Sequence, residues 1–203
     1  MDPQYESSQK VSRIKDYPLI YQSESEISWF LKEISRVLEP GGFCFLWISK
    51  EILMTGKFLV WLRGSSELKV VDLLIWAKPH FGFGSYFRNQ VEFGLLIQKY
   101  PTNSKRFKNR SLGNVWTESV IANSKRNHPH QKPKGLVKAI IEATTDENDL
   151  VVDPCAGSFM VLEACRELGR EFMGCDLTYL AMEEFKSSRG RVCQKCLGLL
   201  SNY

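Results

Sequence analysis

The stretch LVVDPCAGSFMVLEACRELGREFMGCDL, residues 150–177, decides the fold. It contains a short apolar strand that ends at Asp153, a turn that includes Gly157, a helix, and a second strand that is followed by Asp176. This order is typical of a parallel sheet, in which ligands bind at the carboxyl ends of the strands. A single glycine is a poor pyrophosphate cradle, so the turn and the acid favour a nucleoside without pyrophosphate. The alternative is that Asp153 only caps the helix and Gly157 only permits the turn.

The alternation of strands and helices extends outward from this stretch. Continuous or alternating apolar runs predict strands over residues 43–48, 70–77, 91–97, 150–153 and 171–175. Apolar residues at helical spacing predict helices over residues 23–38, 51–62, from 133 onward, 158–168 and 179–186. Ser23 and Glu26 are placed as a capping box for the first helix. The expected fold is α/β, a largely parallel sheet with helices on both faces.

Composition restricts the class of protein. A chain of 203 residues that is 43% hydrophobic suits one domain over 1–203 with a proper core. The longest apolar run, residues 43–48, is far shorter than the roughly 18 residues of a membrane span. The N-terminal residues show no targeting segment, and six scattered cysteines suit reduced thiols rather than disulfides. We expect a soluble, cytoplasmic protein with no membrane partner.

Positive charge is concentrated in the middle of the chain. Residues 99–138 carry ten Lys or Arg against one acid, Glu118, a net charge of +9 in a chain whose total is +4. Residues 99–127 have no periodicity and predict a basic loop, which is either a solvated loop or a segment that meets phosphate. The candidate nucleic-acid contacts are Lys105, Arg106, Lys108, Arg110, Lys125 and Arg126.

Short motifs connect these features to a known family. DPQY at 2–5, HPHQKP at 128–133, VVDPCAGS at 151–158 and GREFMGCDL at 169–177 resemble, in this order, the β-class amino-methyltransferases of DNA. The segments RVLEPGGFCFLW (36–47) and FRNQVEFGLLIQK (87–99) resemble the central strands of that family. The resemblance implies a circularly permuted, Rossmann-like methyltransferase fold with S-adenosylmethionine as cofactor and DNA as partner. It places the basic loop in the target-recognition position.

The resemblance also implies catalytic roles for Asp2, Pro3, Gln4 and Tyr5. Asp2 and the carbonyl of Pro3 would hold the hydrogens of an exocyclic amine and align its lone pair with the electrophilic methyl group. Tyr5 would stack on a base flipped out of the duplex. An acid at the first position is the form associated with adenine N6, whereas cytosine-N4 enzymes usually carry Ser there. The alternative is that DPQY is a frayed terminal tetrapeptide.

Cofactor contacts are implied position by position. The residues that match the family's cofactor segments are Gln131, Lys132, Pro133, Asp153, Pro154, Cys155, Ala156, Gly157, Ser158 and Asp176. His128 and His130 lack a carboxylate or cysteine at ligand spacing, so no metal site is predicted. Cys193 and Cys196 form a single C-x-x-C pair with no second pair of ligands, so the pair is treated as incidental. Phe81, Phe83, Tyr86 and Phe87 either line the base pocket or, as we expect, pack under a loop.

Several positions depart from the family pattern. Gln4 replaces a second proline, Phe159 replaces a glycine, and Cys155 stands where phenylalanine is frequent. The family places an apolar strand directly before the tetrapeptide, where this sequence has only Met1.

The favoured hypothesis is an adenine-N6 methyltransferase of DNA. The alternatives are a truncated or inactive relative that binds nucleic acid, and a cytosine-N4 or RNA methyltransferase. The oligomeric state, with a homodimer as one arrangement, and pairing with a restriction enzyme stay open.

Overall fold

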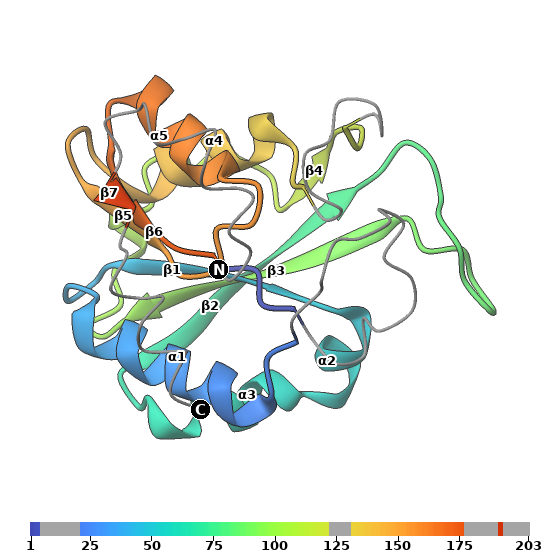
Figure 1. The fold of residues 1–203 in the computed structure, drawn as a ribbon, viewed down its shortest axis with the longest axis horizontal. Helices are drawn as coiled ribbons and strands as arrows, with labels where there is room; N and C mark the ends of the chain where they lie inside the picture. Colours follow the sequence, from blue (N-terminus) through green and yellow to red (C-terminus); the bar gives the residue numbers. More distant parts are fainter. Residues whose placement is uncertain (5–20, 122–130, 177–190, 193–203) are drawn as a thin grey trace. The chain divides into compact units, whose positions relative to one another are not determined.

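The computed structural model describes residues 1–4, 21–121, 131–176 and 191–192. They fall into two compact units. The helices and strands of both are labelled in Figure 1. The first unit is described over residues 2–4 and 21–119, and the second over residue 1, residues 120–121, 131–176 and 191–192. A single domain over the whole chain stays a prediction.

The first unit is built on a four-stranded sheet in the order β1-β3-β2-β4. Its strands are β1 (Phe43–Ile48), β2 (Leu68–Ala77), β3 (Val91–Lys99) and β4 (Val115–Thr117). β3 pairs antiparallel with both β1 and β2, and only β2 and β4 are parallel. The largely parallel arrangement predicted from the sequence is therefore wrong for this sheet. The reason is that residues 78–90 join β2 to β3 without the crossover helix that a parallel pair needs.

The helices of the first unit are α1 (Glu24–Val37), α2 (Lys50–Thr55) and α3 (Lys57–Trp61), with the 3₁₀ helices η2 (Leu62–Gly64) and η3 (Ser104–Arg106). The predicted capping box is confirmed, because the Ser23 side chain accepts from Glu26 N–H and the Glu26 side chain accepts from Ser23 N–H. Gly56, with φ of 67°, breaks the helix predicted over 51–62 into α2 and α3. A left-handed residue ends an α-helix, and glycine adopts this conformation most easily.

The second unit has a parallel three-stranded sheet in the order β5-β6-β7. Its strands are β5 (Leu150–Asp153), β6 (Glu171–Gly174) and β7 (Arg191–Val192), and its helices are α4 (Lys134–Thr144) and α5 (Met160–Leu168). The strand–helix–strand order and the parallel pairing predicted from residues 150–177 are confirmed here. The helix predicted over 179–186 lies outside the described residues.

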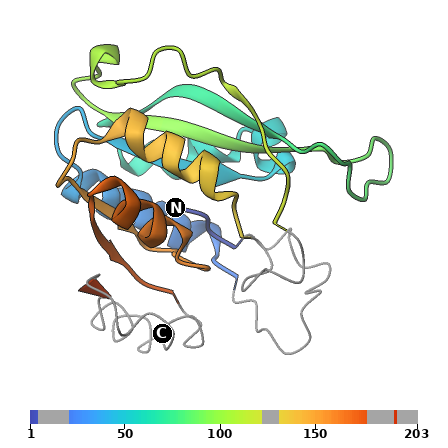
Figure 2. The ribbon, with the colours of Figure 1, turned by 90° about the horizontal axis from the view of Figure 1, so that it is seen from above.

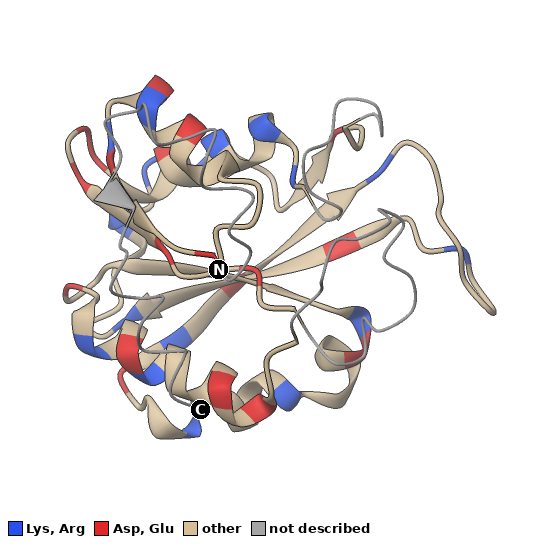
Figure 3. Cartoon of the chain, viewed as in Figure 1, with Lys and Arg blue, Asp and Glu red and all other residues tan. Residues whose placement is uncertain are grey.

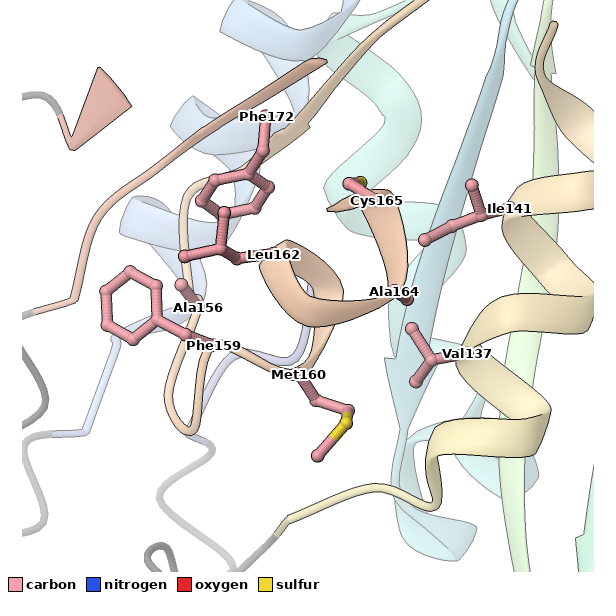
Figure 4. Packing of buried hydrophobic residues seen from close by; sticks show 9 residues of the cluster. All are labelled: Val137, Ile141, Ala156, Phe159, Met160, Leu162, Ala164, Cys165 and Phe172. Atoms are coloured by element: carbon pink, nitrogen blue, oxygen red, sulfur yellow. The ribbon is translucent and has the colours of Figure 1, made fainter. Parts of the chain in front are cut away.

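Helices α4 and α5 lie side by side in the second unit (Figure 2). Val137 and Ile141 of α4 join Ala164 and Cys165 of α5 in one buried cluster that also includes Phe159 and Phe172 (Figure 4). This core fixes α5, and therefore the turn that precedes it. None of the helices in the described ranges is long and apolar enough to span a membrane.

Candidate active site

Two aspartates stand at the carboxyl ends of the neighbouring parallel strands β5 and β6. Asp153 is the last residue of β5 and is 6% exposed, whereas Asp176, two residues beyond β6, is half-buried. The loops after the two strands are joined directly. Asp176 Oδ2 accepts a hydrogen bond from the Gly157 N–H at 2.8 Å, and the Ala156 N–H donates to the Cys175 carbonyl at 2.9 Å. The acid and the glycine turn predicted as a nucleoside site therefore lie together at one edge of this sheet.

Asp153 holds the first half of the turn. Its Oδ1 accepts from the Cys155 N–H at 3.2 Å, and the amino group of Met1 lies 3.8 Å from the same oxygen. A side chain that accepts from the backbone two residues on fixes a local turn. Asp153 therefore fixes the turn and does not cap α5, whose N-cap residue is Phe159 with no side-chain cap hydrogen bond. Of the other turn residues, Pro154 and Cys155 are half-buried, whereas Ala156 and Ser158 are buried.

Phe159 closes the turn in an unusual way. Its φ is 54°, in the left-handed region, and its side chain is fully buried, with its ring 6.3 Å from that of Phe172 in an edge-on contact (Figure 4). The resemblance noted from the sequence implies glycine at this position, for which positive φ carries no steric cost. Burial of the phenyl ring offsets the strain of this backbone here. Nearby, burial raises the pKa of the Cys165 thiol to about 11, so this thiol is neutral and packs as an apolar group.

Gln131, Lys132 and Pro133 precede α4 in the same unit as the turn. Pro133 is fully buried and occupies the N-cap position, while Gln131 and Lys132 are half-buried. Helix α4 is fixed to α5 by ion pairs of Lys134 with Glu163 and Glu167, and of Lys138 with Glu167. The hydrogen bond from Lys134, and then that from Lys138, lowers the pKa of Glu167 below its usual value. The segment predicted to lie near the cofactor carboxylate is thereby held by a structured helix start.

The tetrapeptide belongs to the first unit. Pro3 is buried, Asp2 and Gln4 are half-buried, and Tyr5 lies outside the described residues. The Gln4 N–H donates to Gln22 Oε1 at 2.6 Å, and the Gln4 carbonyl accepts from the Gln22 N–H at 2.9 Å. Gln4, the last described residue of DPQY, is therefore paired with Gln22, which argues against the frayed terminus considered above.

The basic loop divides into residues with different surroundings. Arg106 donates to the Pro40 carbonyl at 2.7 Å and forms an ion pair with Glu39, so it anchors the turn before β1. Lys105, Lys108 and Arg110 are exposed, and Arg110 donates to Ser104 Oγ at 3.3 Å. Lys125, Arg126, His128 and His130 lie outside the described residues. Within the described ranges, no group of three or more His, Cys, Asp or Glu side chains could hold a metal ion.

Residues 1–187 match the family N6_N4_Mtase, described as DNA methylase. The chain belongs to this family of DNA methylases. The resemblance predicted from four short motifs is confirmed, and the match covers both units.

Individual relatives agree with this assignment. The chain is 36% identical over 188 residues to the type II methyltransferase M.HhaII of Haemophilus parahaemolyticus. The matched region covers 88% of this chain and 81% of that protein. It spans only 53% to 65% of the length of three other type II methyltransferases. Among solved structures, the M1.HpyAVI–SAM complex has a TM-score of 0.66 at 22% identity, with 84% of each chain covered. The cytosine-N4-specific PvuII DNA methyltransferase has a TM-score of 0.65 at 15% identity, covering 99% of this chain and 82% of that one. These structures confirm the methyltransferase fold.

This DNA methylase carries an exposed aromatic hairpin, residues 78–90, between β2 and β3. Tyr86 is 98% and Phe87 91% exposed, and Phe81 and Phe83 are exposed as well. The expectation that these rings pack under a loop is wrong. The hairpin projects beyond the sheet of the first unit (Figures 1 and 2) and has basic but no acidic positions (Figure 3).

Hydrogen bonds between its two arms fix the backbone of the hairpin. Gly82 N–H donates to the Asn89 carbonyl, and Asn89 Nδ2 donates to the Phe83 carbonyl. A Cβ on Gly84 would come within 2.1 Å of the Phe87 carbonyl oxygen, so the tip needs glycine there. Arg88 lies 5.9 Å from the centre of the Phe81 ring. The exposed rings are therefore carried by a hairpin whose backbone is fixed by hydrogen bonds and by a close approach at Gly84.

Two features of the site were missed by sequence reasoning. Gln22 was not singled out, because a lone glutamine before a helix carries no signal in one sequence. The strand β4 was treated as part of a loop, because three residues are too few for a pattern; it is held by the Trp76 Nε1–H, which donates to the Glu118 carbonyl at 2.8 Å.

Proposed function

We propose that this methylase transfers a methyl group from S-adenosylmethionine to the exocyclic N6 amine of adenine in DNA, by direct attack on a flipped-out base. The observation that carries the proposal is the joined turn at the ends of β5 and β6, where the Asp176 carboxylate accepts from the Gly157 N–H. Membership of the DNA methylase family supports the reaction class.

The residues of this turn fit S-adenosylmethionine. The cofactor has a ribose that needs an acceptor and no pyrophosphate that needs a glycine-rich cradle. Asp176 offers a half-buried carboxylate at the strand end, and the one-glycine turn fixes its position. Gln131, Lys132 and Pro133 at the start of α4 are the candidates for the methionine carboxylate. When bound, the cofactor supplies an electrophilic methyl group on a sulfonium.

The tetrapeptide prepares the nucleophile. An exocyclic amine is weakly nucleophilic because its lone pair is delocalised into the ring. The Asp2 carboxylate and the Pro3 carbonyl accept the two amine hydrogens and favour a pyramidal nitrogen. With the cofactor bound, the aligned amine would accept the methyl group, the sulfonium would leave as a neutral thioether, and the proton released by the amine would pass to water. The half-buried position of Asp2 and the fixed backbone of Gln4 support this role.

The acid at position 2 favours adenine over cytosine. A cytosine-N4 reaction is the second candidate, since the family covers both amines and the PvuII enzyme shares the fold. RNA as substrate, and an inactive relative that only binds nucleic acid, are further alternatives.

DNA contacts are assigned to the basic loop and to the aromatic hairpin. Lys105, Lys108 and Arg110 are exposed on the basic loop, and Lys125 and Arg126 extend it in sequence. Arg106 is the least suited of the six, because it is engaged with Glu39 and Pro40. The aromatic hairpin offers exposed rings next to Arg88, a combination suited to stacking on bases.

The test is incubation of the chain with tritiated S-adenosylmethionine and unmethylated duplex DNA or RNA, followed by nucleoside analysis. We expect label in N6-methyladenine from DNA. Label in N4-methylcytosine, or in RNA only, would replace the proposed substrate. Cofactor binding by calorimetry without any label would support the inactive alternative, and the loss of both would reject the proposal.

A further inference from the structure

We infer that Gln22 is a positioning residue for the tetrapeptide, and that its side chain orients the Pro3 carbonyl. The inference rests on the proposed function, in which that carbonyl accepts a hydrogen of the target amine. It explains how the backbone of the tetrapeptide is oriented in this chain, which has Gln4 where the family has a second proline.

The two hydrogen bonds between residues 4 and 22 engage both backbone polar groups of Gln4. The Gln4 N–H donates to Gln22 Oε1 at 2.6 Å, and the Gln4 carbonyl accepts from the Gln22 N–H at 2.9 Å. Proline has no N–H and could not make the first of these bonds. The amide of Gln4 therefore creates a contact that the usual D-P-P-Y sequence cannot have.

The first bond fixes the direction of the Pro3 carbonyl. The Pro3 C=O and the Gln4 N–H belong to one planar peptide unit, which is trans here, so they point in opposite directions. Because Gln22 Oε1 holds the N–H, rotation of this peptide plane would break the hydrogen bond. Gln22 thereby acts through the backbone on an atom that is proposed to touch the substrate.

Gln22 itself is held by the start of α1. The next residue, Ser23, is the N-cap, with its N–H donating to Glu26 Oε2 at 2.6 Å and its Oγ accepting from Glu26 N–H at 3.3 Å. Ile27 and Leu31 are buried and fix the helix within the first unit. The contact thus runs from a capped, packed helix to the residue that follows Asp2 and Pro3.

The substitution Gln4→Pro is expected to behave differently in two backgrounds. In the native chain, the Cδ of the introduced proline ring would replace the amide hydrogen that faces Gln22 Oε1, only 2.6 Å from the nitrogen, so the Gln22 side chain would have to move. With Gln22→Ala that obstacle is removed, and the ring restricts the backbone instead. The effect of Gln4→Pro should therefore change sign between the two backgrounds.

The experiment compares the native chain with Gln22→Ala, Gln22→Glu, Gln4→Pro and the Gln4→Pro/Gln22→Ala double variant. Methyl transfer to DNA is measured as kcat and KM, together with cofactor affinity by calorimetry. We expect Gln22→Ala to lower kcat about tenfold, the scale of one hydrogen bond, with cofactor affinity unchanged. Gln22→Glu keeps the acceptor oxygen and should retain most activity. The double variant should recover most of the loss caused by Gln22→Ala.

Hydrogen exchange of the Gln4 amide supplies a readout that does not need activity. We expect this amide to be protected in the native chain and in Gln22→Glu, and to exchange at least about tenfold faster in Gln22→Ala. The Leu38 amide, which donates to the Ile34 carbonyl in α1, is the control and should not change.

The outcomes separate this inference from the proposed function. A Gln4 amide that exchanges freely in the native chain overturns the inference whether or not the chain is active. Full activity of Gln22→Ala, or equal damage from Gln4→Pro in both backgrounds, overturns it while methyl transfer stands. Protection of the amide without any methyl transfer would keep the contact but reject the proposed function, and with it the catalytic role given to Gln22.

Discussion

Phe159 is a residue whose backbone and side chain have opposite effects on stability. The left-handed conformation costs a non-glycine residue about 1–2 kcal/mol, whereas the ring is fully buried against Phe172. Replacement of the ring by Ala should cost roughly 3–5 kcal/mol, because a cavity forms while the backbone strain stays the same. Phe159→Gly removes the strain as well and should be more stable than Phe159→Ala by roughly 0.5–1 kcal/mol, as measured by chemical denaturation.

Leu162 provides the matched control for this prediction. It is buried in the interior of α5, three residues further on, with ordinary helical geometry. There the order should be reversed, with Leu162→Gly less stable than Leu162→Ala by about 1 kcal/mol. If the Ala variant were more stable than the Gly variant at both positions, the Phe159 backbone would not be strained in solution.

The charged residues of the basic loop are not equivalent at the scale of the element. The triple variant Lys105→Ala, Lys108→Ala, Arg110→Ala should weaken DNA binding and reduce the slope of log Kd against log salt by about 0.9 for each lost phosphate contact. Arg106→Ala should leave that slope nearly unchanged, because Arg106 already pairs with Glu39 and Pro40. A binding titration at several salt concentrations distinguishes the two. An unchanged slope in the triple variant removes these residues from the interface.

The aromatic hairpin permits a test in which folding should not interfere. Tyr86→Ala and Phe87→Ala truncate almost fully exposed rings, so stability should change by less than about 0.5 kcal/mol. If the rings stack on bases, each substitution should weaken binding to DNA with an unpaired target base by roughly 1–3 kcal/mol. Met54→Ala on α2, at a side chain that is 77% exposed in the same unit, is the control. Binding equal to that of the native chain in both aromatic variants contradicts the stacking role.

The elements that the sequence predicted well have their signals within a few residues. The capping box of α1 spans Ser23 to Glu26, and the strand–turn–helix from β5 to α5 lies within residues 150–168. The contacts that were missed join distant segments. Arg106 and Glu39 are 67 positions apart, and Gln4 and Gln22 are 18 apart. A periodic pattern within one segment cannot predict contacts between distant segments. The antiparallel pairing of β3 with β1 and β2 was missed for the same reason, because it also joins distant segments.

At the scale of the whole molecule, the candidate residues divide between the two units. The first unit carries Asp2 and Pro3, the exposed basic residues Lys105, Lys108 and Arg110, and the aromatic hairpin, which are groups proposed to contact DNA. The second carries the turn with Asp153 and Gly157, Asp176, and the start of α4, which are the groups proposed to hold the cofactor. Substitutions in one unit should therefore affect one ligand and leave the affinity for the other intact.

This division makes Asp2 and Asp176 a complementary pair of variants. Asp176→Ala removes the carboxylate at the end of β6 and the acceptor for the Gly157 N–H, so it should weaken cofactor binding by calorimetry. Asp2→Ala lies in the other unit and should leave the cofactor affinity as it is in the native chain.

The most direct measurement is the rate of methyl transfer to adenine in DNA by the native chain and by Asp2→Ala, both at saturating S-adenosylmethionine. The account predicts that the native chain forms N6-methyladenine and that Asp2→Ala loses about 10²-fold or more of this rate, because a preorganised acceptor at the reacting amine is removed. Full activity of Asp2→Ala would contradict the assignment of the tetrapeptide as the catalytic site.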